Sequence, residues 1–317
     1  MKVLMWHVHG AWATAFVHGR HEVLVPLTPD RGPDGRGLPA TYAWPASARA
    51  VSPGELAQEQ FDVVVLQRTE EIDLLRLWCG LRAGVDVPAV FVEHNAPLQP
   101  VASRHPLAEQ SRIPIVHVTH FNALMWDNGR ARTEVIEHGI PDPGARYRGT
   151  LPRAAVVVNE PLRRGRVTGT DLLSTVADSA AVDVFGIGTA ALTTSAHRHK
   201  ILGHGDIAHD PLLDLVAGRR VYVHLCRWTS LGLSLLEAMA MGMPVVGLST
   251  TAAPESLAAS AAVLTNDPHV LRSALREYLN DDAAADAAGR RNRSAVLSRF
   301  SLERFQTDWD RVLKEVL

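Results

Sequence analysis

A single carboxylate, Glu237, lies within the otherwise apolar stretch from Leu231 to Leu248, and it follows Gly232 by five residues. A lone charge is costly to bury unless another group satisfies it. If a helix begins here, after the strand-like run 219–225, the backbone N–H groups of Ser230–Leu233 are free at its N-terminus. Such an N-terminus favours phosphate, and a glycine lets a ligand approach the backbone closely. The stretch therefore predicts a diphosphate site.

The spacing between Gly232 and Glu237 suits a nucleotide. Five helical residues cover about 7.5 Å at about 1.5 Å per residue, which matches the span from a diphosphate to its ribose. A carboxylate can accept hydrogen bonds from both hydroxyls of a ribose. We therefore predict that Glu237 binds a ribose. The alternative is that Glu237 lies on an exposed stripe of the helix and only meets solvent.

Three arginines, Arg163, Arg164 and Arg166, follow the strand-like run 154–160 and precede a helix that we expect to start at Gly169. Loops after parallel strands face the ligand crevice of an open α/β sheet, and guanidinium groups pair well with diphosphate. We expect at least one of the three to bind diphosphate; the alternative is a solvated basic loop. No Asp-x-Asp pair follows a predicted strand, so we predict no metal site and a metal-independent reaction.

Histidines mark the expected strand ends of the first half of the chain. His94 ends one apolar run, where it would face the ligand crevice; the alternative is a structural histidine bonded to nearby backbone. His7 and His9 alternate on the first run, so we expect them to share a face and to line an acceptor pocket with Gly10. His120 follows another run in a similar place. No HExxH-type spacing supports a zinc site.

Apolar runs rich in β-branched residues alternate with helical patterns along both halves, which predicts two α/β units with parallel sheets. The stretch Gly139–Arg153 is dense in proline and glycine and is the expected linker. A last helix after Ser301 should bury one apolar face and return to the N-terminal domain. The expected strands are the runs 2–8, 21–27, 61–67, 87–95, 113–120, 133–139, 154–160, 181–188, 219–225 and 243–249.

Length and composition describe an ordinary globular protein. The 317 residues suffice for two domains, and 46% of them are hydrophobic. The formal net charge of −2 gives no global basic field for nucleic acid. Two distant cysteines indicate a reducing compartment, and we expect a cytoplasmic protein for which peripheral membrane contact stays open. The histidine-rich patch 197–200 is expected to be a solvated loop.

The segment Thr229–Glu255 resembles the nucleotide-sugar motif of retaining GT-B glycosyltransferases of family 4, also called group 1. Shared features are Glu237, the Ala-Met-Ala-x-Gly-x-Pro-Val-Val run and the loop that closes at Pro254-Glu255. Phe91–Pro97 and Val135–Pro143 are similar to segments of the family's N-terminal half. The resemblance implies an α/β GT-B fold, which has two Rossmann-like domains with a cleft between them. Its acceptor domain would span residues 1–145, its donor domain 146–300, and the helix 301–317 would pack back on the first domain.

The resemblance also implies an activity, the transfer of a hexosyl group from a nucleoside-diphosphate-sugar to an acceptor hydroxyl, with retention. The acceptor would be a glycan, lipid or small molecule, and no cofactor beyond the donor is implied. Glu237 would bind ribose, Gly232 and its neighbours diphosphate, and His94 would reach the point of transfer. Two departures concern donor contacts: Thr229 replaces the first motif glutamate, and Thr168 replaces a lysine. These departures leave the alternative that the chain is a non-catalytic nucleotide-sugar-binding protein. A third alternative is a nucleotide-sugar hydrolase or epimerase.

Overall fold

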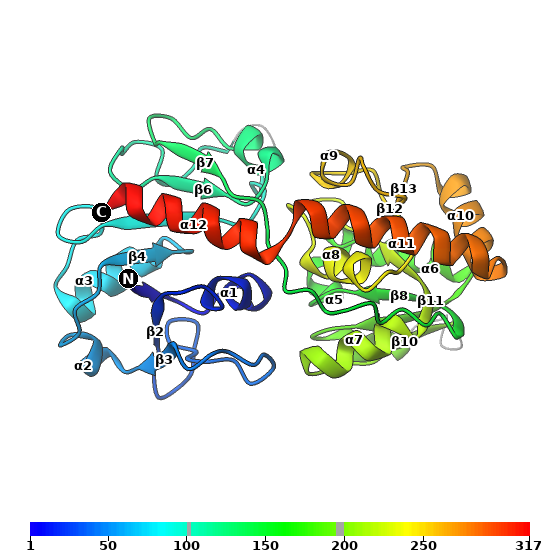
Figure 1. Cartoon of the computed structure of the whole chain (residues 1–317), viewed down its shortest axis with the longest axis horizontal. Coiled ribbons are helices and arrows are strands. Elements are labelled where there is room, and N and C mark those ends of the chain that lie inside the picture. Colours follow the sequence, from blue (N-terminus) through cyan, green and yellow to red (C-terminus); the bar gives the residue numbers. More distant parts are fainter. Residues whose placement is uncertain (100–102, 195–199) are drawn as a thin grey trace. The chain divides into compact units, whose positions relative to one another are not determined.

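The computed structural model describes residues 1–99, 103–194 and 200–317. The chain divides into two compact units, drawn in Figure 1. Unit 1 comprises Met1–Gly139 and Leu302–Leu317, and unit 2 comprises Ile140–Ser301. The histidine patch 197–200 falls almost wholly outside the described residues. In the part of the chain that is described, no helix is both long and apolar enough to cross a membrane.

Unit 1 is built on a parallel sheet whose described strands run in the order β3-β2-β1-β4-β5-β6-β7. The central strands β1, β4 and β5 are nearly continuous apolar runs, because helices cover both faces of the sheet. The strands are β1 (Lys2–Met5), β2 (Glu22–Pro26), β3 (Ala48–Val51), β4 (Val63–Leu66), β5 (Ala89–Glu93), β6 (Ile115–His117) and β7 (Thr133–Val135). The helices are α1 (Gly10–Val17), α2 (Pro53–Leu56), α3 (Glu70–Cys79), α4 (His120–Met125) and α12 (Leu302–Val316).

The last helix, α12, belongs to the core of unit 1 and is drawn in red in Figure 1. Its Trp309 packs edge-on against Trp12 and Phe16 of α1, with ring centroids 5.5 Å apart in each pair. Phe305 adds a further edge contact with Trp12. These aromatic side chains are buried, and their contacts pack α12 against α1 on one face of the sheet. Helices α2 and α3 cover the other face of the sheet.

Unit 2 is a second parallel sheet, with its described strands in the order β10-β9-β8-β11-β12-β13. Helices α6 and α10 pack over one face, and α7 and α8 contact the other near β11. The strands are β8 (Leu151–Val157), β9 (Ala181–Phe185), β10 (Ile201–Gly203), β11 (Arg219–His224), β12 (Val245–Gly247) and β13 (Val263–Leu264). The α-helices are α5 (Pro161–Arg164), α6 (Leu173–Ala177), α7 (His209–Ala217), α8 (Leu233–Ala240), α9 (Ala253–Ser256), α10 (Pro268–Asn280) and α11 (Asp282–Arg299).

Several expected boundaries are wrong. The first strand ends at Met5 rather than at residue 8, and the strand expected over 133–139 ends at Val135. β8 begins at Leu151, inside the stretch taken as a linker. The edge strands β3, β10 and β13 were not expected at all, because each has four residues or fewer and lacks a long apolar run.

Candidate functional site

Each sheet reverses its strand order next to its first strand, and that reversal places a ligand crevice at the carboxyl ends of the strands. In unit 1 the reversal lies between β1 and β4, which are paired in parallel. In unit 2 it lies between β8 and β11. The segments that follow these four strands carry the predicted site residues of both halves, except that His94 and His120 follow β5 and β6.

His94 is buried directly after β5, where several side chains from neighbouring strand ends surround it. Its Nε2 lies 3.0 Å from Oε1 of Gln67, which follows β4. Its ring lies 4.0 Å from that of His9 between centroids, with the two planes tilted by 33°, and meets the edge of Trp12 at 5.0 Å. Burial, with the nearby His9 and His138, lowers the pKa of His94 well below its ordinary value, so the ring is neutral at pH 7.

The strand argument for His7 and His9 is wrong, because β1 ends before both residues. His9 is the N-cap residue of α1 and turns toward His94. His7 instead directs Nδ1 to the carbonyl of Gly37, 3.0 Å away, and its ring packs against Trp44. Burial lowers the pKa of His7.

Gly10 lies beside the side chain of His7. A Cβ at residue 10 would lie 3.0 Å from the ring of Tyr42 and 3.6 Å from Nε2 of His7, which leaves little room for a side chain. His120 is the first residue of α4 and is exposed. The acceptor role of these residues stays a prediction.

The N-terminus of α8 lies where the diphosphate site was predicted. Gly232 is its N-cap residue, no side chain caps the helix, and Leu233 is its first helical residue. A Cβ at residue 232 would lie 2.8 Å from Cε1 of His224, the last residue of β11, so a glycine is needed for this close approach. Burial lowers the pKa of His224 to about 4, which keeps the ring neutral beneath the helix end.

The side chains of the residues just before α8 are mostly buried inside unit 2. Leu231 and Ser230 are buried, whereas Thr229 is half-buried. The carbonyl of Ser230 accepts a hydrogen bond of 2.9 Å from the hydroxyl of Thr251. The predicted donor contacts at this position are therefore contacts of backbone rather than of side chains, apart from Thr229.

Glu237 is half-buried on α8, and the structure gives it a partner that the sequence did not reveal. Its Oε1 lies 2.8 Å from Nε2 of His209, the first residue of α7. Burial opposes the charge of His209, but the hydrogen bond and the charge of Glu237 outweigh it and raise the pKa of His209. The expected alternative, a carboxylate that only meets solvent, is wrong.

The three arginines do not form one open loop, because Arg163 and Arg164 lie in α5 and Arg166 in a 3-10 turn, Gly165–Val167. The helix expected to start at Gly169 begins as a 3-10 turn, Thr170–Leu172, and continues directly as α6 from Leu173. Arg163 forms an ion pair with Glu160, and Arg166 pairs with Asp171 at 2.9 Å.

Arg164 differs from its two neighbours. It is half-buried, and within the described ranges no carboxylate pairs with it. Burial raises the pKa of the Cys226 thiol to about 11, and the positive charge of Arg164 partly opposes that rise. Arg164 therefore lies close to the segment after β11, at the strand reversal of unit 2.

Thr168, which replaces a lysine of the family pattern, is buried. Its hydroxyl donates to the carbonyl of Gly165 at 3.1 Å and lies 3.1 Å from the hydroxyl of Thr170. The side chain thus holds the turn that follows α5. Its predicted donor contact stays a prediction.

Four residues near these strand ends were missed by sequence reasoning. Gln67 and His224 end or follow apolar runs, a signal that was applied to His94 but not to them. His209 and Arg227 precede the motif segment Thr229–Glu255 and were not singled out. Arg227 forms an ion pair of 2.5 Å with Asp171, so this carboxylate pairs with two arginines. No group of three or more metal-ligating side chains is found among the residues that the structure describes.

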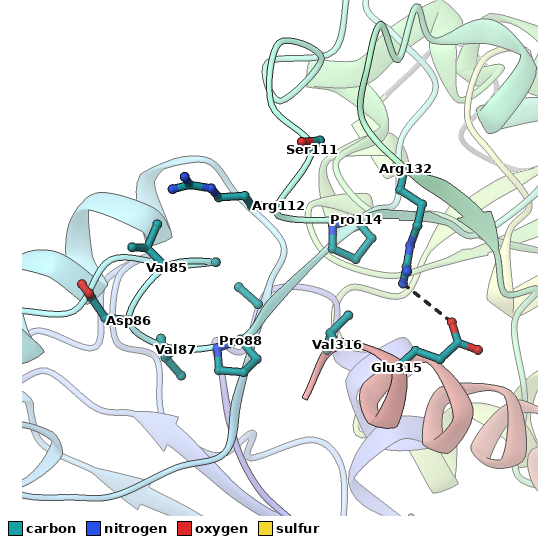
Figure 2. A pocket seen from close by; sticks show the side chains of 12 residues that line it. Val85, Asp86, Val87, Pro88, Ser111, Arg112, Pro114, Arg132, Glu315 and Val316 are labelled. Atoms are coloured by element: carbon teal, nitrogen blue, oxygen red, sulfur yellow. Dashed lines mark ion pairs between the residues drawn. The ribbon is translucent and has the colours of Figure 1, made fainter.

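A pocket of about 320 Å³ lies elsewhere on unit 1 (Figure 2). It is lined by Ala89, the first residue of β5, and by Pro114 and Arg132, which immediately precede β6 and β7. It therefore opens at the amino ends of these strands, the opposite edge of the sheet from His94. Figure 2 shows Arg132 directed toward Glu315, an ion pair of 3.7 Å, and Arg112 on the other side of Pro114.

Comparison with known proteins gives a family for part of unit 2. Residues 171–281 match the family described as Glycosyl transferases group 1. This segment contains Gly232, Glu237 and the newly found His209. No curated protein matches the chain in sequence.

Solved structures match the whole chain. Sucrose-phosphate synthase from Thermosynechococcus elongatus is 13% identical, with 99% of this chain and 98% of that chain covered and a TM-score of 0.72. HepE of Anabaena, in complex with UDP, is 13% identical over 99% and 100% of the two chains, with a TM-score of 0.70. A glycosyltransferase from Rickettsia africae ESF-5 is 12% identical over 99% and 98%, with a TM-score of 0.67. The predicted α/β fold of GT-B type is confirmed.

Proposed function

Because the chain has a GT-B fold and carries a glycosyl transferases group 1 segment over residues 171–281, we propose that it transfers a sugar from a nucleoside-diphosphate-sugar to an acceptor hydroxyl. The observation that supports this proposal most is the crevice of unit 2. There the N-terminus of α8, which no described side chain caps, Arg164, which no described carboxylate pairs with, and Glu237 come from segments that follow β8 and β11. In this proposal unit 2 binds the donor and unit 1 the acceptor, and the reaction takes place in the cytoplasm.

The donor is a nucleoside-diphosphate-sugar. The backbone at Gly232 binds its diphosphate, and Glu237 binds its ribose. His209 occupies Oε1 of this carboxylate, so Oε2 is the oxygen that accepts from the ribose hydroxyls. A protonated His209 also keeps the charge of Glu237 balanced when no nucleotide is present. UDP is the first nucleotide to test, since HepE was solved with UDP.

Catalysis in this proposal consists of orientation and of stabilisation of the departing diphosphate. Arg164 and the N-terminus of α8 neutralise the charge that develops on the leaving group, without a metal ion. Retention of configuration at the sugar is part of the proposal and rests on the resemblance of the motif around Glu237. The acceptor in this proposal is a glycan, a lipid or a small molecule.

The proposal is tested first by thermal shift with UDP, GDP, ADP and dTDP, and then by incubation of the matching sugar nucleotides with and without acceptor extracts. Transfer of sugar that requires an acceptor supports the proposal. Binding without turnover would support a non-catalytic nucleotide-sugar-binding protein. Release of free sugar, or of an isomer, without acceptor would support a hydrolase or an epimerase.

We expect transfer to persist in excess EDTA, because cationic side chains and a helix N-terminus take the place of a divalent ion. The measurement is the initial rate with EDTA and after addition of Mg²⁺ or Mn²⁺. Loss of activity in EDTA that either ion restores would contradict the metal-independent reaction.

Replacing Glu237 with glutamine should weaken binding of the nucleoside diphosphate by about 1–3 kcal/mol, the scale of a hydrogen bond to a charged group. Calorimetry measures the affinity, and a 2′-deoxyribose nucleotide should lose less affinity in the variant than in the wild type. Glu277→Gln, the same change at an exposed position of α10, is the matched control and should change nothing. Equal affinities of Glu237→Gln and wild type would contradict the ribose role.

Replacing His94 with alanine should lower turnover by about tenfold to a hundredfold, the loss of one or two hydrogen bonds in the transition state. The affinity for the nucleoside diphosphate should stay unchanged, because the proposed donor residues all lie in unit 2. Rates and calorimetry together separate the two effects. Turnover within a factor of about two of wild type would leave His94 a structural residue.

A further inference from the structure

Gln67 joins the backbone of Trp6, the residue that follows β1, to the ring of His94 through the two ends of its side-chain amide. Its Nε2 donates to the carbonyl of Trp6, 2.6 Å away, and its Oε1 lies 3.0 Å from Nε2 of His94. Gln67 and His94 are both buried. The strands that they directly follow, β4 and β5, are parallel neighbours, so the two side chains meet at adjacent carboxyl ends.

The orientation of this amide is decided by chemistry. A backbone carbonyl can only accept a hydrogen bond, so the group that faces Trp6 must be the NH₂ of Gln67. The oxygen of the amide then faces His94. Since an amide oxygen also only accepts, Nε2 of His94 must carry the hydrogen.

We propose that Gln67 is a positioning residue that holds the neutral ring of His94 in its Nε2–H tautomer and leaves Nδ1 as a hydrogen-bond acceptor. Nδ1 forms no hydrogen bond with any residue that the structure describes. The ligand class that this atom suits is a hydroxyl group, either of the transferred sugar or of the acceptor. The tautomer follows from the structure alone, and only its use in transfer rests on the proposed function.

A buried carboxylate fixes the backbone position of Gln67. Glu71 of α3 is fully buried, and its Oε2 accepts from the backbone N–H of Gln67 at 2.7 Å. Its Oε1 accepts from Nε of Arg68 at 3.0 Å. The N-terminal turn of α3 thus fixes the backbone from which the amide reaches His94, so the amide has little freedom to turn away.

Other ionisable groups near the ring do not compete for Nε2 of His94. The ring of His9, the N-cap residue of α1, lies 4.0 Å from that of His94 between centroids in a tilted arrangement, and His138 acts on His94 through its charge. Both disfavour a second proton on His94, as burial does. A neutral ring with one defined hydrogen is the state that these neighbours allow.

The test is the ¹⁵N NMR spectrum of protein labelled at histidine, recorded above pH 7, with the signals of His94 assigned by their loss in His94→Gln. In wild type we expect Nε2 to carry the proton and Nδ1 to be bare. In Gln67→Met, which keeps the length of the side chain but removes both hydrogen bonds, we expect a mixture of tautomers. Gln58→Met, at an exposed position, is the matched control and should leave the signals of His94 unchanged.

Gln67→Glu separates positioning from packing. A carboxylate still accepts from Nε2 of His94 but cannot donate to Trp6, so this variant keeps the tautomer and favours the protonated ring. We expect it to raise the pKa of His94 in the same spectra. If Gln67 only fills space, Gln67→Met would match wild type in tautomer, and that result would overturn the proposal. A wild-type ring protonated at Nδ1 would overturn it without any variant.

Activity provides a second readout. Gln67→Met should lower turnover by about tenfold to a hundredfold, as His94→Ala does, with the donor KM unchanged. Wild-type turnover in Gln67→Met would overturn the use of this tautomer in transfer. A chain that transfers no sugar yet shows the Nε2–H tautomer would reject the proposed function and uphold the assignment of Gln67.

Discussion

Replacing Arg164 with alanine is expected to lower turnover by about 30-fold or more and to leave the fold intact. Truncating one partner of a buried charge pair costs about 2–5 kcal/mol, and each 1.4 kcal/mol is about tenfold in rate. Arg164 is the arginine of α5 and its following turn that has no carboxylate partner among the described residues. Its guanidinium group is therefore free to pair with the departing diphosphate.

The neighbouring arginines are natural controls for Arg164, because each already has an acidic partner and an exposed side chain. Arg163 pairs with Glu160 and Arg166 with Asp171. Exposed ion pairs contribute only about 0–1 kcal/mol, so Arg163→Ala and Arg166→Ala should keep nearly full turnover. Initial rates at saturating donor show which of the three single variants loses turnover. Full activity of Arg164→Ala, or of the variant in which all three arginines are replaced with alanine, would contradict the diphosphate role and indicate that this segment is only a solvated surface.

Replacing Asp183 with asparagine should destabilise unit 2 by about 3–5 kcal/mol, the cost of removing one partner from a buried ion pair. Asp183 lies in β9, and its carboxylate has three partners: Arg153 at 2.6 Å, Arg219 at 2.7 Å and His204 at 3.2 Å. Arg219 is itself buried. An asparagine would leave this guanidinium group inside the unit without an opposite charge.

The effect of Asp183→Asn should depend on pH in a defined direction. Burial alone would raise the pKa of Asp183, but hydrogen bonds from Arg153 and Arg219, together with the nearby His204, outweigh it and lower the pKa. A lowered pKa contributes stability above the ordinary value of about 3.9 and loses it as the pH falls through the folded value. The gap between variant and wild type should therefore shrink in strong acid.

Urea denaturation, fitted with one transition per unit, measures the loss of stability in Asp183→Asn. The matched control is Asp178→Asn, the same change at an exposed position after α6. A surface substitution of this kind changes the free energy of unfolding by about 0.5 kcal/mol or less. Equal stabilities of the two variants at pH 7 would contradict the role of the Asp183 network.

The sequence was a good guide where one local pattern was enough. Apolar runs rich in valine predicted the central strands β1, β4, β5, β8, β9 and β11, because strands covered on both faces need no polar residues. The edge strands β3, β10 and β13 were missed since they are short and only partly buried, so packing rather than composition forms them. Strand ends were misplaced for the same reason, and the error mattered at His7 and His9, whose faces were inferred from a strand that had already ended.

The sequence by itself determined that the chain is an α/β protein of two units with parallel sheets, and that the segment around Glu237 begins a helix after a buried strand. Both follow from periodicity and from the order of residues along the chain, which act over a few residues. Tertiary structure alone decided which partners meet: Gln67 with His94, His209 with Glu237, and Glu160 and Asp171 with two of three similar arginines. The arginine pairs are short-range, but the other partners come from segments that lie far apart in the sequence. They meet only because parallel strands pack side by side, which brings the carboxyl ends of the strands together.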